Sequence, residues 1–306
     1  MLHNSVFIRD LMSRYHYPAA AVDVFTAVED RLDNEPEFGA AFDRIADGFL
    51  YKKTISFGEA LREIDALAKE YGVHQYTLEF VFIMNGAEEA KRRYAAAGLA
   101  DEVFYDTWDD LRCKLLECME CDGVPGTSVG GWYGRFFDLS LRGFGRFEYV
   151  PTVFDWDLEY TMQCGRVFKP GDLYLDMHIP SSGVPLTDEI RFDSYKKAYK
   201  AYAHLFPEEK IVIGTMSWLL YPAHRRFLPK NSNILRFMDD FEPVSFEIKD
   251  KFYYDWRIFG AAAGKPYEEL PRDTSLRRAW ADWMASGNKA GDAFGIFLFD
   301  GEKIIR

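Results

Sequence analysis

The chain has 306 residues, of which 48% are hydrophobic and 17% aromatic, so it can bury a large core and is not disordered. Its formal net charge of −12 disfavours nucleic acid as a partner, because nonspecific binding to nucleic acid needs a positive field. No apolar run reaches the roughly 18–20 residues of a membrane span, and the N-terminus lacks a signal-peptide pattern. These features predict a cytoplasmic protein of about two domains, with neither nucleic acid nor a membrane as partner.

Helical patterns fill the first part of the chain. Segment 18–32 opens with a proline and repeats apolar residues at helical spacing. Ser56 and Glu59 have the spacing of a capping box, and Gly72 has the position of a C-cap. The sequence therefore predicts a helical N-terminal domain over residues 1–125.

The cysteines do not have the spacing of a zinc site. Cys118 and Cys121 are separated by two residues, but they fall in a helical pattern and no histidine lies near them in sequence. Structural zinc sites usually need a second pair of ligands. We therefore interpret the cysteines as reduced thiols and expect no metal site.

A glycine-rich stretch, residues 121–131, predicts the domain boundary, and strand patterns follow it. The predicted β-rich segments are 145–154, 160–180 with a turn at "KPGD", 210–218, "EPVSFEI" and "AFGIFLFDGEKII". Helices are predicted from Ser194 to Phe206, from Ser232 to Phe241 and near "TSLRRAWADWMAS". The fold class is therefore α+β: a helical domain followed by a mixed α/β domain over residues 126–306.

Two of the predicted strands end in polar side chains. Strand 173–179 carries His178 and strand 210–218 carries Ser217, and each is followed by a proline within a few residues. The helix between them suits a right-handed crossover, which makes the two strands parallel neighbours. Parallel neighbours end at the same edge of a sheet, so His178 and Ser217 are expected within reach of one ligand.

Four motifs occur in a fixed order: "GDLYLDMHIP", "SYKKAY", "SWLLYP" and "SNI" followed by two phenylalanines. In this order they resemble bacterial two-domain proteins that have an N-acyltransferase N-terminal domain and a GNAT-like C-terminal domain. The resemblance implies a GNAT-like fold and acyl transfer from acetyl-CoA or another acyl-CoA. It also implies a small-molecule amine or a peptide as acceptor.

In a GNAT-like sheet, the arm of acyl-CoA lies between two parallel strands that separate. The resemblance thus suggests His178 as general base and Ser217 as hydrogen-bond donor to the thioester or thiolate, with Tyr221 as an alternative proton donor. Each residue has a structural alternative: His178 and Ser217 can simply be hydrogen-bonded at strand ends, and Tyr221 can be a packing residue.

The chain departs from ordinary GNAT enzymes at the loop that binds the CoA pyrophosphate. The usual Arg/Gln-x-x-Gly-x-Gly/Ala pattern is replaced by "SSGVPLTDEIRFDS". Amides of Ser181, Ser182 and Gly183 are the candidate pyrophosphate ligands, with Lys196 and Lys197 expected near the helix start.

Three functions remain open at this point. The first is an acyl-CoA-dependent N-acyltransferase of unspecified acceptor. The second is a non-catalytic GNAT-like protein that binds a ligand or a partner. A hydrolase acting through Ser217 is disfavoured, because no G-x-S-x-G elbow surrounds that serine.

Overall fold

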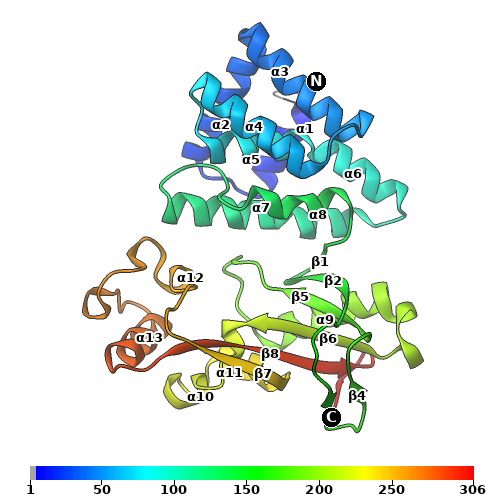
Figure 1. Cartoon of the computed structure of the whole chain (residues 1–306), viewed down its shortest axis with the longest axis vertical. Helices are drawn as coiled ribbons and strands as arrows, with labels where there is room; N and C mark the ends of the chain where they lie inside the picture. Colours follow the sequence, from blue (N-terminus) through cyan, green and yellow to red (C-terminus); the bar gives the residue numbers. More distant parts are fainter. Residues whose placement is uncertain (1–4) are drawn as a thin grey trace. The chain divides into compact units, whose positions relative to one another are not determined.

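The computed structural model describes residues 5–306, and these residues fall into two units (Figure 1). The first unit ends at Arg142 and the second spans Gly143–Arg306. The first is helical and the second is built on a mixed sheet, which confirms the predicted α+β class. In the described part of the chain, no helix combines the length and apolar composition needed to cross a bilayer.

The units divide further along the chain than the predicted position after residue 125, because the glycine-rich stretch packs back on the helical unit. The backbone N–H of Thr127 donates to the carbonyl of Tyr76 at 3.1 Å. A Cβ on Gly130 would lie only 1.9 Å from Oε2 of Glu79, so this close approach requires glycine. The stretch is therefore a packed part of the first unit.

The first unit is a group of helices with short connections. They are α1 (Val6–Arg14), α2 (Ala19–Asn34), α3 (Pro36–Asp47), a π-helical turn (Gly48–Lys52), α4 (Phe57–Tyr71), α5 (Gln75–Asn85), α6 (Ala87–Ala96), α7 (Asp101–Cys121) and α8 (Gly134–Phe137), with a 3₁₀ turn at Gly130–Tyr133 before α8. Helix α5 is buried from Thr77 to Asn85 and forms the centre of the unit.

The capping box predicted for α4 is confirmed. Ser56 Oγ accepts from the N–H of Glu59 at 3.2 Å, and Glu59 Oε2 accepts from the N–H of Ser56 at 2.8 Å. We expect Ser56→Ala to lower the free energy of unfolding by about 1 kcal/mol, because an N-cap oxygen satisfies an otherwise unpaired helix amide. Urea unfolding measures the change. The control is Ser13→Ala on exposed α1 surface; an equal loss in both variants would contradict the capping role.

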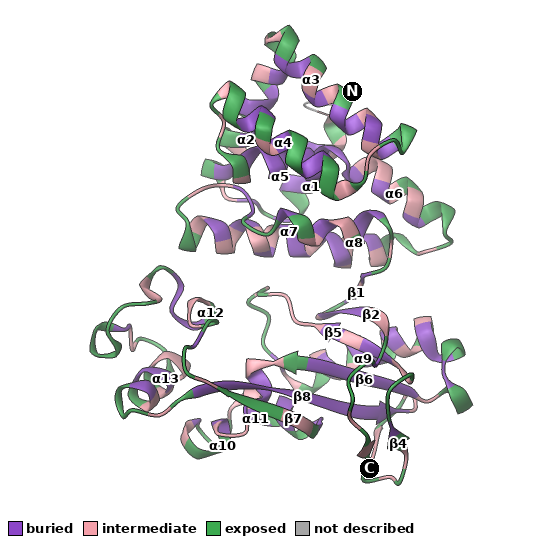
Figure 2. Cartoon of the chain, in the orientation of Figure 1, coloured by how far each residue is buried: buried purple, intermediate pink, exposed green. Residues whose placement is uncertain are grey.

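The second unit contains β1 (Arg142–Phe144), β2 (Phe147–Val153), β5 (Leu173–His178), β6 (Ile211–Ser217), β7 (Glu242–Lys249), β8 (Ala290–Phe299) and β9 (Ile304–Ile305) in one sheet. The order is β1-β2-β5-β6-β8-β7, with β9 beside β8. Strands β5 and β6 pair in parallel, as predicted, whereas the pairs β2–β5, β6–β8, β7–β8 and β8–β9 are antiparallel. Strand β8 is buried along its whole length at the centre of this unit (Figure 2).

One face of the sheet, which we call the α9 face, is covered by helices α9 (Asp188–Tyr202) and α11 (Asn233–Asp239). Tyr195 of α9 lies 4.9 Å from Phe297 of β8, measured between ring centroids. Phe237 of α11 is fully buried and lies 6.0 Å from Phe147 of β2. The aromatic stripes of both helices thus face the sheet.

The opposite face, which we call the hairpin face, carries the small β-hairpin of β3 (Tyr160–Thr161) and β4 (Val167–Phe168). The predicted turn at "KPGD" is confirmed: the N–H of Asp172 donates to the carbonyl of Lys169 at 3.0 Å, and Gly171 has φ of 95°. However, the turn does not join two paired strands. Strand β4 pairs with β3, whereas β5 belongs to the main sheet.

The remaining helices of the second unit are α10 (His224–Phe227), α12 (Trp256–Phe259) and α13 (Ser275–Ala285). Helix α13 lies where "TSLRRAWADWMAS" predicted one, with Thr274 as its N-cap. Helix α11 has the expected Ser232 N-cap. Helix α9 begins earlier than the predicted Ser194, because Thr187 precedes a first turn that carries Asp188 and Glu189.

Candidate functional site

The candidate site lies at the carboxyl end of the parallel pair β5–β6. Within residues 5–306 these strands pair only at Leu175–Ile213 and Asp176–Gly214. Beyond that level β5 continues beside β2, and β6 continues beside β8. The two strands therefore separate and leave backbone groups along an opening, the arrangement in which an amide-bearing arm can bind as an added strand would.

His178 ends β5 on the hairpin face. Its Nε2 lies 3.4 Å from Oδ2 of Asp176, two residues earlier on the same face. The two side chains are about a quarter to a third exposed (27% and 29%), whereas Nε2 of His178 itself is buried against the protein. A histidine held by a carboxylate at the mouth of an opening is suited to accept a proton.

Glu148 is a residue of this site that the sequence analysis missed. It lies on β2 directly opposite His178 in the antiparallel register and is buried. Opposite side chains on one face have Cβ atoms roughly 4.5–5.5 Å apart, so the carboxylate faces the imidazole side of β5. The available signal was a lone acid in the aromatic segment "RFEYV", but no local pattern pairs it with His178.

Ser217 ends β6 on the α9 face, opposite to His178. The register pairs Asp176 with Gly214, so Met216 is level with His178 and Ser217 points the other way. Ser217 is also directly opposite Ala293 of β8. The two residues therefore lie at the same end of the sheet, but their side chains are on opposite faces. That both reach one ligand stays a prediction.

The Ser217 hydroxyl has a structural role. Its Oγ accepts from the N–H of Leu219 at 3.1 Å and caps a 3₁₀ turn at Trp218–Leu220. This bond leaves the hydroxyl proton available for donation. Tyr221 follows the turn and is largely buried, with its ring against Gly291 of β8, and burial raises the pKa of its phenol.

The predicted pyrophosphate loop is anchored by two arginines. Arg146 donates to the carbonyls of Pro180 at 2.8 Å and Val184 at 3.1 Å, and Arg257 Nη1 donates to Oγ of Ser181 at 3.0 Å. The sequence analysis did not identify either arginine, because both are distant from the loop in sequence.

Within that loop, Ser182 and Gly183 form a local turn. Ser182 Oγ accepts from the N–H of Val184 at 3.3 Å, and Gly183 has φ of 77°. Contrary to the prediction, Lys196 and Lys197 do not lie at the start of the next helix, because α9 begins earlier, at Asp188. Lys197 instead pairs with Asp193 of the same helix at 3.2 Å.

A buried histidine lies behind the β6 end. His224 is fully buried among the rings of Trp218, Tyr221, Phe227 and Trp280, at centroid distances of 5.9, 6.0, 5.5 and 5.3 Å. Its Nδ1 lies 3.3 Å from the carbonyl of Leu219. Burial lowers the pKa of this imidazole to about 4.

This low pKa predicts a loss of stability in acid. Because His224 has a pKa of about 4 in the folded chain and about 6.5 when unfolded, the unfolded state binds the proton first as the pH falls. The associated stability should be present above pH 6.5 and be lost towards pH 4, by about 3 kcal/mol in total.

Urea unfolding of the wild type and His224→Asn, at pH values from 7.5 to 4, tests this pH dependence. We expect a shallower pH dependence in the variant, because asparagine does not titrate in this range. The exposed His204→Asn is the control and should follow the wild type. If the free energy of unfolding fell equally with pH in His224→Asn and the wild type, His224 would not be the source of the acid sensitivity.

Among the described residues, no group of three or more His, Cys, Asp or Glu side chains is arranged to hold a metal ion. Cys113 and Cys118 are buried thiols in α7, and burial raises the pKa of Cys118 to about 12. The candidate site combines His178 and its neighbouring carboxylates with an opening between strands and an anchored loop.

A helical domain followed by a mixed sheet whose central parallel pair opens at its carboxyl end defines the class of GNAT-like proteins. The family comparison agrees. Residues 6–139 match the N-acyltransferase N-terminal domain, and residues 141–297 match the GNAT-like C-terminal domain. The chain belongs to the family of proteins that combine these two domains.

Several solved structures share the fold. One is an acyltransferase in complex with decanoyl-CoA, with TM-score 0.70 and 21% identity over 94% of this chain and 86% of that chain. Another is an acyltransferase in complex with CoA and 10C-teicoplanin, with TM-score 0.73 and 20% identity over 97% and 88% of the two chains. No curated protein sequence matches the chain significantly.

Proposed function

We propose that this protein is an acyl-CoA-dependent N-acyltransferase. The observation that carries the proposal is the opening between β5 and β6 beyond Asp176 and Gly214, with His178 at its edge. The opening suits the pantetheine arm, and His178 suits proton transfer at the thioester. The structural neighbours support an acyl-CoA donor, because they were crystallised with decanoyl-CoA, octanoyl-CoA or CoA.

The chemistry assigned to His178 is general-base catalysis. The acceptor amine attacks the thioester carbonyl, a C–N bond forms, and the amine proton passes to the imidazole. Collapse of the tetrahedral intermediate breaks the C–S bond and releases the CoA thiolate, which takes up a proton to form the thiol. Asp176, and Glu148 across the strand pair, would orient the imidazole and stabilise its charged form.

The leaving thiolate needs a hydrogen-bond donor. Ser217 is our first candidate, because its hydroxyl borders the opening at the end of β6 and retains its proton after capping the 3₁₀ turn. Tyr221 is the alternative donor, although its ring is largely buried. Ser217→Ala and Tyr221→Phe distinguish them, since only the variant that removes the true donor should lower kcat.

For the CoA pyrophosphate we propose the backbone amides of Ser181, Ser182 and Gly183. Arg146 and Arg257 already anchor this loop and add positive charge beside it. This assignment replaces the predicted contribution of Lys196 and Lys197.

For the acceptor we propose an amine on a small molecule or a peptide-like compound. One structural neighbour was crystallised with decanoyl-CoA and teicoplanin, which is consistent with an acceptor of this class. A protonated amine would also be attracted by the acidic groups around His178, and the chain as a whole is acidic.

The test is release of CoA thiol from acetyl- to octanoyl-CoA in the presence of an amine panel, with the acylated product identified by mass spectrometry. Thiol release that depends on both the protein and the amine supports the proposal. Tight CoA binding without transfer to any amine would instead support a non-catalytic binding protein.

A further inference from the structure

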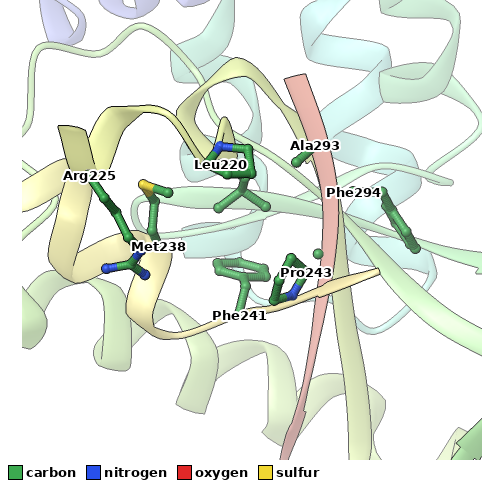
Figure 3. A pocket seen from close by; sticks show the side chains of 9 residues that line it. Leu220, Arg225, Met238, Phe241, Pro243, Ala293 and Phe294 are labelled. Carbon is green, nitrogen blue, oxygen red and sulfur yellow. The ribbon is translucent and has the colours of Figure 1, made fainter. Parts of the chain in front are cut away.

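A small apolar cavity lies on the α9 face, next to the end of β6 (Figure 3). Its volume is about 70 Å³. The main wall residues come from the 3₁₀ turn after β6, from α11 and the segment that follows it, and from β7 and β8: Leu220, Met238, Phe241, Pro243, Ala293 and Gly295. None of these side chains carries a hydrogen-bonding group.

The cavity exists because β8 has small residues on this face. Ala293 and Gly295 form its floor. A Cβ on Gly295 would lie 2.9 Å from Cδ1 of Leu220 and 3.0 Å from Cβ of Phe241, closer than side chains normally approach, so both wall residues pack directly against this glycine. A methyl group here would push Leu220 and Phe241 aside and change the cavity.

The cavity borders the proposed reaction site. Ala293, part of the floor, is the direct register partner of Ser217 on β6. Adjacent strands are about 4.8 Å apart, so the cavity begins one strand spacing from the β5–β6 opening. His178 lies on the other face, so an amine that approaches from His178 and a group that enters the cavity would reach a thioester from opposite sides.

The wall chemistry favours an acyl chain over an amine. Arg225 is the charged residue of the wall, and its guanidinium pairs with Asp239 at 2.7 Å. Apart from this ion pair the walls are apolar, so a protonated amine would lose its hydration there, whereas an alkyl chain gains from apolar burial, about fourfold in affinity per methylene (~0.8 kcal/mol).

We propose that this cavity holds the acyl chain of the donor and restricts the donor to short chains, with about three carbons beyond the thioester carbonyl. The inference rests on the proposed acyl-CoA function. The size follows by comparison: a cavity of about 150 Å³ holds benzene, with its six carbons, so about 70 Å³ has room for about half that number. Longer chains exceed this volume and must displace a wall residue such as Met238 or Phe241.

The experiment is calorimetric titration of the full-length chain with CoA, acetyl-, butyryl- and octanoyl-CoA, which needs no acceptor. We expect affinity to rise from acetyl- to butyryl-CoA and to fall at least tenfold for octanoyl-CoA. Octanoyl-CoA binding as tightly as butyryl-CoA would overturn the chain-length limit while leaving the donor class intact. Failure of CoA and every ester to bind would overturn the proposed function itself.

Variants test the cavity residues. Met238→Ala should enlarge the cavity and improve octanoyl-CoA binding at least tenfold. Met284 is an equally buried methionine on α13, and Met284→Ala should leave the dependence of affinity on acyl-chain length unchanged. Gly295→Ala should weaken butyryl-CoA about tenfold and leave CoA binding unchanged. If Met238→Ala does not fold, Phe241→Leu serves the same purpose; an unchanged profile in every folded variant would overturn the assignment.

Discussion

His178→Ala should lower kcat for acyl transfer by roughly 10²- to 10⁴-fold, the range that a general base contributes. The imidazole lies beside Asp176 at the open end of β5, where an incoming amine must lose a proton. Because the side chain is partly exposed and ends a strand, its removal should change the melting temperature little. Initial rates of CoA thiol release, with the amine acceptor in excess, measure the effect.

The matched control is His204→Ala, which removes an exposed histidine of the same unit. It should retain wild-type kcat. Glu148→Gln is the informative second variant: if Glu148 orients the imidazole, kcat falls while the KM for acyl-CoA changes little. A large loss of stability with unchanged activity in His178→Ala would assign His178 to strand-end structure instead.

Asp240→Ala should lower the free energy of unfolding by about 3–5 kcal/mol, the cost of leaving one partner of a buried ion pair alone. Arg191 of α9 is 2% exposed, and its Nε and Nη2 donate to the two carboxylate oxygens of Asp240 at 2.7 and 3.2 Å. Tyr195 also donates to Asp240 at 3.0 Å. The substitution would leave a buried guanidinium without its counter-charge.

The neighbouring residue provides the control. Asp239 pairs with Arg225 at the surface, where both side chains are more than half exposed. Exposed pairs contribute about 0–1 kcal/mol, so Asp239→Ala should have little effect. Urea unfolding followed by tryptophan fluorescence measures both variants, and similar small losses in both would contradict the importance of the buried pair.

The Arg191–Asp240 pair also connects stability to the site. Arg191 Nη1 donates to the carbonyl of Leu186 at 2.7 Å, at the end of the loop proposed to bind the CoA pyrophosphate. The pair therefore joins α11, α9 and that loop. We expect Asp240→Ala, where it still folds, to weaken CoA binding more than Asp239→Ala does.

The sequence by itself determined the elements whose signals are local. The Ser56–Glu59 capping box, the "KPGD" turn and the ends of β5 and β6 all appear as predicted, because each depends on residues a few positions apart. The helical pattern between the two strand patterns also predicted, correctly, that β5 and β6 are parallel neighbours. The order of the four motifs was sufficient to identify the family to which the chain belongs.

Only the tertiary structure decided which side chains share the site. Strand register places His178 and Ser217 on opposite faces and brings Glu148 opposite His178, and a shift of one residue would exchange the faces. Register depends on packing between segments that are distant in sequence, so no local pattern specifies it. The tertiary structure also decided the role of the glycine-rich stretch expected as a linker: its glycines pack against α5, because glycine fits both a flexible chain and a close backbone contact.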